Sequence, residues 1–148
     1  MFREAHASWK GGSYAGEGEV STPSGVLNHA PYSFGKLAET PPSTTPCELL
    51  TAAIASSMSL MVAREMARLD VKPVTVDILA VLTLDNPGDK WQITGGHLKI
   101  NARAMVADKK RFEQAVEAAR LQCPVSAALK LNLTCATELI ALTASSAA

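Results

Sequence analysis

Three cysteines, Cys47, Cys123 and Cys135, carry most of the chemistry that this sequence offers. Cys47 and Cys123 fall at the predicted beginnings of helices, where unpaired amide groups and the helix dipole favour a thiolate that attacks peroxides and disulfides. Free cysteines more often serve as small buried hydrophobic residues, and both interpretations stay open for these two. Cys135 shares one face of a predicted strand with leucines, which favours an inert thiol.

Three serines in one predicted helix, Ser56, Ser57 and Ser59, are the second candidate centre. A helical serine usually donates its hydroxyl to the carbonyl four residues back. No histidine or acid lies within one helical turn of Ser57, so no base is at hand to activate it. We therefore interpret the serines as structural.

No metal or cofactor is expected from the remaining polar residues. His6, His29 and His97 match no metal-ligand spacing, and Gly16 and Gly18 are not followed by a helix that would hold a phosphate. An odd number of cysteines without a CxxC pair argues against a disulfide framework or a zinc site.

The charge of the chain is balanced, with 14 basic and 14 acidic residues among 148, so no basic surface for nucleic acid is expected. The first ten residues contain no apolar run of the kind that a signal peptide needs. The longest apolar segment, 49–62, is shorter than the ~20 residues of a membrane span. These features predict a soluble, cytoplasmic protein without a membrane or nucleic-acid partner.

The elements that must position these residues follow from turn signals and periodicity. Residues 2–34 read as about three short strands, separated by KGGS at 10–13 and TPSG at 22–25. A loop follows at 35–44. Thr45, Pro46 and Glu48 then form a capping box, which predicts a helix with Thr45 as its N-cap and Cys47 in its first turn. Apolar residues lie on every side of this helix through Val62, which predicts that it is buried.

The second half predicts a strand pair, two helices and a last strand. Residues 74–84 alternate as a strand and turn at NPGD, 86–89, into a partner strand with a bulge at Gly95-Gly96. Asp108 is a predicted N-cap, Cys123-Pro124 begins another helical turn, and 131–142 is the last strand. The order β-β-β-α-β-β-α-α-β gives a single α+β domain over 1–148. A second copy of the chain could cover the long helix.

Three motifs resemble the OsmC and organic hydroperoxide resistance family, and within it the osmotically inducible protein C group. They are STPSGVLNHAPYSF (21–34), TPCELLTAAIASSMSLM (45–61) and CPVSAALK (123–130). The similarity extends from about His6 to Leu139. It implies an OsmC-like fold with a buried central helix, an intertwined homodimer, and thiol-dependent reduction of organic hydroperoxides at the dimer interface.

The resemblance also implies substitutions at the site. The family's peroxidatic cysteine falls on Ser57, its neighbouring histidine on Ile54 and its glutamate on Cys47. The family's arginine falls on Leu37, with Lys36 beside it as a possible cation. The second family cysteine is retained as Cys123.

A hydroxyl at Ser57 forms no sulfenic acid, so the family mechanism with re-reduction by a dithiol such as a lipoyl group is not expected in its ordinary form. One hypothesis is an altered peroxidase in which Cys47 is the nucleophile and Cys123 the resolving thiol. The alternative is a non-catalytic dimer that binds a lipid-like or aromatic molecule in an apolar interface cleft.

Overall fold

The computed structural model describes residues 1–12, 15–33, 42–105 and 108–142. The chain divides into two compact units, Met1–Leu50 and Thr51–Ala148, and the division falls within the longest helix. Lys36 and Leu37 lie outside the described residues, and the expectation of one domain over 1–148 stays a prediction.

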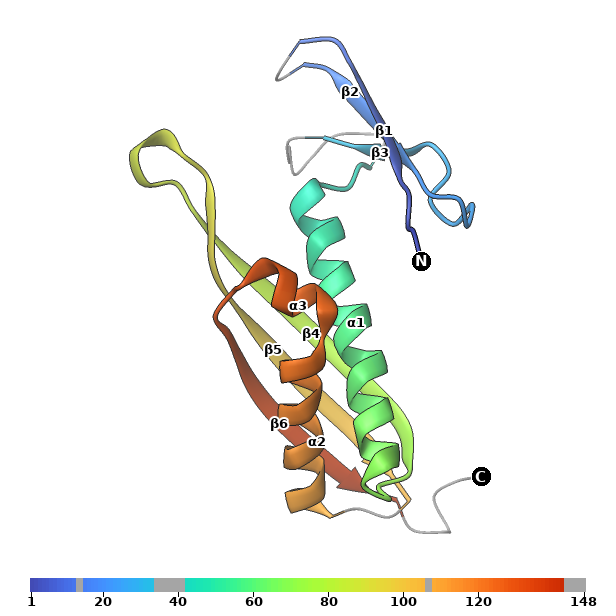
Figure 1. The fold of residues 1–148 in the computed structure, drawn as a ribbon. Helices are drawn as coiled ribbons and strands as arrows, with labels where there is room; N and C mark the ends of the chain where they lie inside the picture. The colour runs from blue at the N-terminus through green and yellow to red at the C-terminus, as the bar shows by residue number, and fades with distance from the viewer. Residues whose placement is uncertain (13–14, 34–41, 106–107, 143–148) are drawn as a thin grey trace. The chain divides into compact units, whose positions relative to one another are not determined.

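The first unit contains the predicted meander of three strands (Figure 1). These are β1 (His6–Lys10), β2 (Glu17–Ser21) and β3 (Ala30–Tyr32), paired antiparallel in the order β1-β2-β3. The predicted turn after β2 is closed by a hydrogen bond from the Gly25 amide to the Thr22 carbonyl at 2.9 Å. Gly25 has a φ of +74°, a conformation that glycine adopts without steric cost.

Helix α1 (Pro46–Arg68) begins with the predicted capping box. The Glu48 amide donates to the Thr45 hydroxyl at 3.1 Å, and the Thr45 amide donates to the Glu48 carboxylate at 3.0 Å. The helix ends in a Schellman motif. There the Val71 amide donates to the Met66 carbonyl at 2.9 Å, and Asp70 takes a left-handed φ of 57°. Met66 and Val71 are both fully buried, which secures the end of the helix.

The second unit is built on a three-stranded sheet in the order β4-β5-β6. β4 (Pro73–Asp85) pairs antiparallel with β5 (Gln92–Ala104), and the 3-10 turn η1 (Pro87–Asp89) lies between them. The register shifts where Thr83 pairs with Gly95 and Leu84 with Ile93, which confirms the predicted bulge. β6 (Leu133–Ala141) runs parallel to β5, so the chain must cross over between them.

The crossover consists of α2 (Lys109–Gln122) and α3 (Pro124–Leu129). The Asp108 carboxylate accepts from the Arg111 amide at 3.1 Å, which confirms the predicted N-cap of α2. Figure 1 shows α2, α3 and the second-unit part of α1 on the same face of this sheet. The buried core between these layers combines residues of α1, α2 and β5, among them Ile54, Met58, Val62, Phe112, Ala115, Leu98 and Ile100. The mixed α+β fold therefore agrees with the prediction.

Burial of α1 differs from the expectation that all of its sides are covered. Five of its residues are buried, namely Ile54, Met58, Val62, Glu65 and Met66. Leu60, on another side of the helix, is 72% exposed in the single chain. Within the second unit, one side of α1 is therefore covered, because the β4-β5-β6 sheet and α2 offer one apolar layer against it.

Helix α1, with 23 residues, also has the length and an apolar 18-residue stretch of the kind that a membrane span needs. The sequence expectation counted only residues 49–62 and found them too short. The core helix of a soluble protein satisfies the same two criteria, so length and hydropathy alone do not distinguish the two cases.

Replacing the N-cap tests how far the capping box stabilises α1. We expect Thr45→Ala to lower the free energy of unfolding by about 1 kcal/mol, because the Glu48 amide loses its acceptor. Thr45→Ser keeps the hydroxyl and serves as the matched control, with a value close to that of the unchanged protein. Urea unfolding followed by circular dichroism measures both, and equal losses in the two variants would contradict this role for the hydroxyl.

Candidate functional site

The candidate site lies in the second unit, where α1 and the start of α3 meet at a cysteine sulfur. Cys123 is the residue between α2 and α3: it ends the first helix and is the N-cap of the second. Pro124 follows at the first helical position, as predicted, because a proline there removes no helical hydrogen bond. The Ala127 amide donates to the Cys123 carbonyl at 3.0 Å and closes the first turn of α3.

Two hydroxyl groups converge on this sulfur. The oxygen of Ser57, in the middle of α1, lies 3.1 Å from Cys123 Sγ, and either atom can donate. Ser126 in α3 donates to the same sulfur at 3.3 Å. Cys123 is fully buried, Ser126 is buried and Ser57 is partly buried. The three side chains form a cluster, Ser57–Cys123–Ser126, that is largely shielded from solvent in the single chain.

The surroundings of Cys123 favour its thiolate. Burial by itself raises the pKa of this thiol, because a charge loses its hydration. The hydroxyls of Ser126 and Ser57 and the amides of Ser126 and Val125 oppose this by donating to the sulfur, and the net effect lowers the pKa of Cys123 below its ordinary value. A thiol with a lowered pKa is the reactive kind.

The pKa of the Cys135 thiol is shifted in the opposite direction. Burial raises the pKa of the Cys135 thiol, and the nearby Arg120 offsets this only in part because Glu117 acts against it. Arg120 is itself paired with Glu117 at 2.8 Å, so its charge is already compensated. A raised pKa favours the protonated thiol, and an inert Cys135 stays a prediction.

Ser56 and Ser59 bond backbone carbonyls of their own helix, as expected, although three residues back and not four, whereas Ser57 contacts a side chain. The Ser56 hydroxyl donates to the Ala53 carbonyl at 3.2 Å, and that of Ser59 donates to the Ser56 carbonyl at 2.9 Å. These bonds reach three residues back within α1 and are structural. Ser57 instead bonds a residue 66 positions away, which no local pattern indicates. Ser57 therefore contacts a distant side chain, and its structural interpretation stays a prediction.

Two other residues that the sequence singled out, Cys47 and Ile54, are described by the structure. Cys47 is the second residue of α1 and lies in the first unit, where it is half-buried and interacts with other groups. Its pairing with Cys123 stays a prediction. Ile54 is fully buried in the core, and its correspondence to the family's histidine stays a prediction. Ser126 was not singled out from the sequence. It lies three residues after a predicted N-cap, and a polar residue at that spacing often bonds the N-cap residue, which could have indicated its contact.

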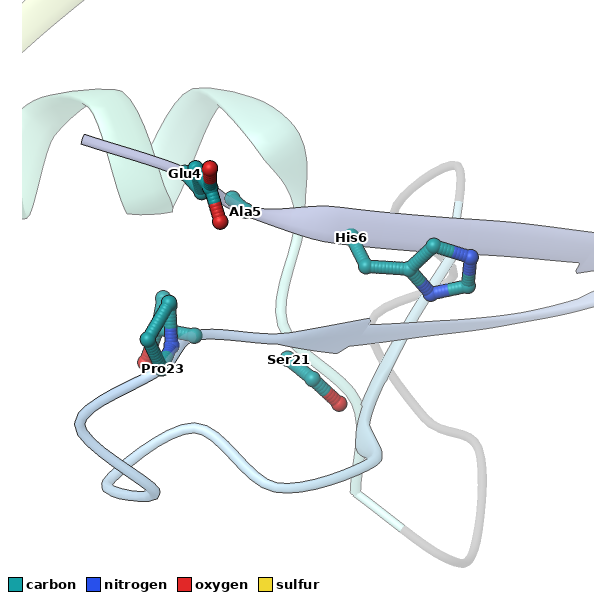
Figure 2. A pocket seen from close by; sticks show the side chains of 6 residues that line it. Glu4, Ala5, His6, Ser21 and Pro23 are labelled. Carbon is teal, nitrogen blue, oxygen red and sulfur yellow. The ribbon is translucent and has the colours of Figure 1, made fainter. Parts of the chain in front are cut away.

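A hollow with a volume of about 460 Å³ lies in the first unit (Figure 2). None of the predicted thiols lines it; its residues are Glu4, Ala5, His6, Ser21, Thr22 and Pro23. Among the residues that the structure describes, no group of three or more His, Cys, Asp or Glu side chains is placed to hold a metal ion.

Comparison with known proteins defines the class to which this fold and site belong. The family model described as OsmC-like protein matches residues 39–138, so the chain belongs to the OsmC-like protein family. Within that family, the chain is 33% identical to Peroxiredoxin OsmC of Escherichia coli K12 over 134 residues, which cover 90% of this chain and 94% of the relative.

Solved structures agree with the fold. An OsmC-like protein from Mycoplasma pneumoniae has a TM-score of 0.78 at 10% identity, covering 95% of this chain and 98% of its own. The organic hydroperoxide resistance protein OhrB of Bacillus subtilis has a TM-score of 0.67 at 21% identity, covering 92% and 97%. The predicted OsmC-like fold is therefore confirmed.

The two thiols of the second unit should ionise in a fixed order. Because donors lower the pKa of Cys123 and burial raises that of Cys135, Cys123 should lose its proton at the lower pH. The ultraviolet absorbance of the thiolate against pH, taken as wild type minus Cys123→Ser and wild type minus Cys135→Ser, measures both. The opposite order would contradict the assignment of Cys123 as the activated thiol.

Proposed function

We propose that this protein acts in hydroperoxide defence as a thiol-dependent reductase whose redox-active thiol is Cys123. The observation that carries the proposal is the contact of the Cys123 sulfur with the hydroxyls of Ser57 and Ser126, at 3.1 and 3.3 Å. Family membership and the similarity to Peroxiredoxin OsmC support the reaction class. Inorganic or small apolar organic hydroperoxides are the substrates, and no metal or prosthetic group takes part.

The reaction follows from the chemistry of a stabilised thiolate. The Cys123 thiolate attacks the outer peroxide oxygen, a sulfur–oxygen bond forms, and the oxygen–oxygen bond breaks. The peroxide leaves as an alkoxide that takes a proton and becomes the alcohol, while the thiolate becomes a sulfenic acid. A dithiol such as a lipoyl group then attacks the oxidised sulfur and releases water. Its second thiol closes a cyclic disulfide and frees Cys123.

In this proposal Ser57 is a hydrogen-bond donor, whereas the family cysteine is a nucleophile. A hydroxyl at this position does not exchange with a disulfide, but it donates a hydrogen bond to the neighbouring sulfur. The side chain therefore supports the thiolate of Cys123 where the resemblance places a nucleophile. The sequence also supports a competing form of the same function, in which Cys47 is the nucleophile and Cys123 the resolving thiol. Lys36 is then a possible cation beside the thiolate.

The proposal includes a homodimer in the cytoplasm. Helix α1 leaves apolar or small residues exposed in the single chain, among them Ala52, Ser56 and Leu60. Burying such a surface removes apolar area from water and favours association. A second copy that packs on this side would complete the cover that the sequence predicts for α1.

Oxidation by a stoichiometric organic hydroperoxide tests the proposal directly. Trypsin separates the three thiols, and Cys123 falls in the peptide 121–130. We expect peptide mass spectrometry after treatment with cumene hydroperoxide and a sulfenic acid trap to find the trap on Cys123 and not on Cys135. Formation of the alcohol should match it in amount, and Cys123→Ser should abolish both.

The alternatives give different results in the same experiment. Trapping at Cys47, or a disulfide between Cys47 and Cys123, would favour Cys47 as nucleophile. Absence of oxidation at every thiol would overturn the redox proposal. Thermal stabilisation by a fatty acyl compound in that case, unchanged in a Cys47→Ser/Cys123→Ser variant, would favour the binding hypothesis.

Restoring the second sulfur tests the geometry around position 57. The oxygen of Ser57 lies 3.1 Å from Cys123 Sγ, so a sulfur on the same carbon needs little movement to form a disulfide. We expect Ser57→Cys to form a disulfide between position 57 and Cys123 after one equivalent of hydroperoxide, detected as the loss of two hydrogens. Ser56→Cys, one residue away on a side that does not contact Cys123, is the control and should form none.

A further inference from the structure

Ser126 contacts the candidate thiol in a way that differs from Ser57. It lies three residues after Cys123, in the first turn of α3, and is only 8% exposed. Its hydroxyl donates to Cys123 Sγ at 3.3 Å, and its amide also helps to lower the pKa of that thiol. Both the hydroxyl and the amide of Ser126 therefore favour the thiolate of Cys123.

We propose that Ser126 is a positioning residue that holds Cys123 as the thiolate, and that Ser57 is a secondary donor with a smaller effect. The role of Ser126 in catalysis rests on the proposed function of Cys123. Ser126 does not touch the peroxide; it acts through the sulfur, whose orientation and charge it stabilises.

The difference between the two serines follows from which atom donates. The Ser57–Cys123 contact permits either direction, so a protonated thiol can donate its hydrogen to the Ser57 oxygen. This contact then stabilises both the thiol and the thiolate, and its effect on the balance between them is reduced. Ser126 donates toward the sulfur, and a donor binds a charged acceptor more strongly than a neutral one. Ser126 therefore favours the thiolate specifically.

Few other groups compete with these donors. The influences on the Cys123 thiol within the described residues are burial, the two hydroxyls, and the amides of Val125 and Ser126. No carboxylate, lysine, arginine or histidine is among them. Because these influences, within the described part of the chain, include no charged side chain, removal of one hydroxyl should have a measurable effect.

The test is a titration of Cys123 in the full-length folded protein. The thiolate absorbance is followed against pH for wild type, Ser126→Ala, Ser57→Ala and Ser56→Ala, each as the difference from the same protein that also carries Cys123→Ser. We expect Ser126→Ala to move the titration of Cys123 to higher pH, and Ser57→Ala to move it less. Ser56→Ala should leave it unchanged, because that hydroxyl bonds the Ala53 carbonyl. Circular dichroism confirms that each variant is folded.

The outcomes separate this inference from the proposed function. An unchanged titration in Ser126→Ala, or a larger shift in Ser57→Ala, would overturn the role of Ser126. If Ser126→Ala shifts the titration but no thiol is oxidised by hydroperoxide, the positioning role stands and the proposed function fails. If both hold, Ser126→Ala should slow oxidation of Cys123 several-fold near neutral pH and recover toward the wild-type rate at higher pH. A loss caused only by altered packing would persist at every pH.

Discussion

The hydrogen bonds that reach the sulfur of Cys123 are the interaction on which the rest of the site depends. A buried thiolate is unfavourable unless donors replace the water that it loses. Here Ser57 and Ser126 supply hydroxyls, and the start of α3 supplies amides. Without these donors, Cys123 would resemble Cys135, whose pKa is raised by burial. Two cysteines of the same unit thus have pKa values shifted in opposite directions.

The fold brings these donors together by ordinary means. The crossover from β5 to the parallel strand β6 places α2 and α3 on the face of the sheet that α1 also covers. Buried side chains such as Ile54 and Met58, on either side of Ser57 in the sequence, hold this part of α1 against the core. Packing of α1 therefore decides how close the Ser57 oxygen comes to the sulfur.

The resemblance places a cysteine at position 57, and a serine there supports a different kind of chemistry. A serine and a cysteine differ little in size, so the surrounding core accepts either side chain. They differ in nucleophilicity and in the strength of the hydrogen bond that they donate. A site with two neighbouring sulfurs resolves its own oxidised state, whereas a site with one sulfur and two hydroxyls depends on a thiol from elsewhere. The proposed dithiol reductant follows from this difference.

Local patterns in the sequence determined the elements and their ends, because capping and turn formation involve residues within a few positions of one another. The box of Thr45 and Glu48, the N-cap at Asp108 and the helix start at Cys123-Pro124 are all of this kind. Only the tertiary structure decided that Ser57 meets Cys123 across 66 residues, and that one side of α1 is left uncovered by its own chain. Such contacts depend on how distant elements pack, which periodicity along the chain does not predict.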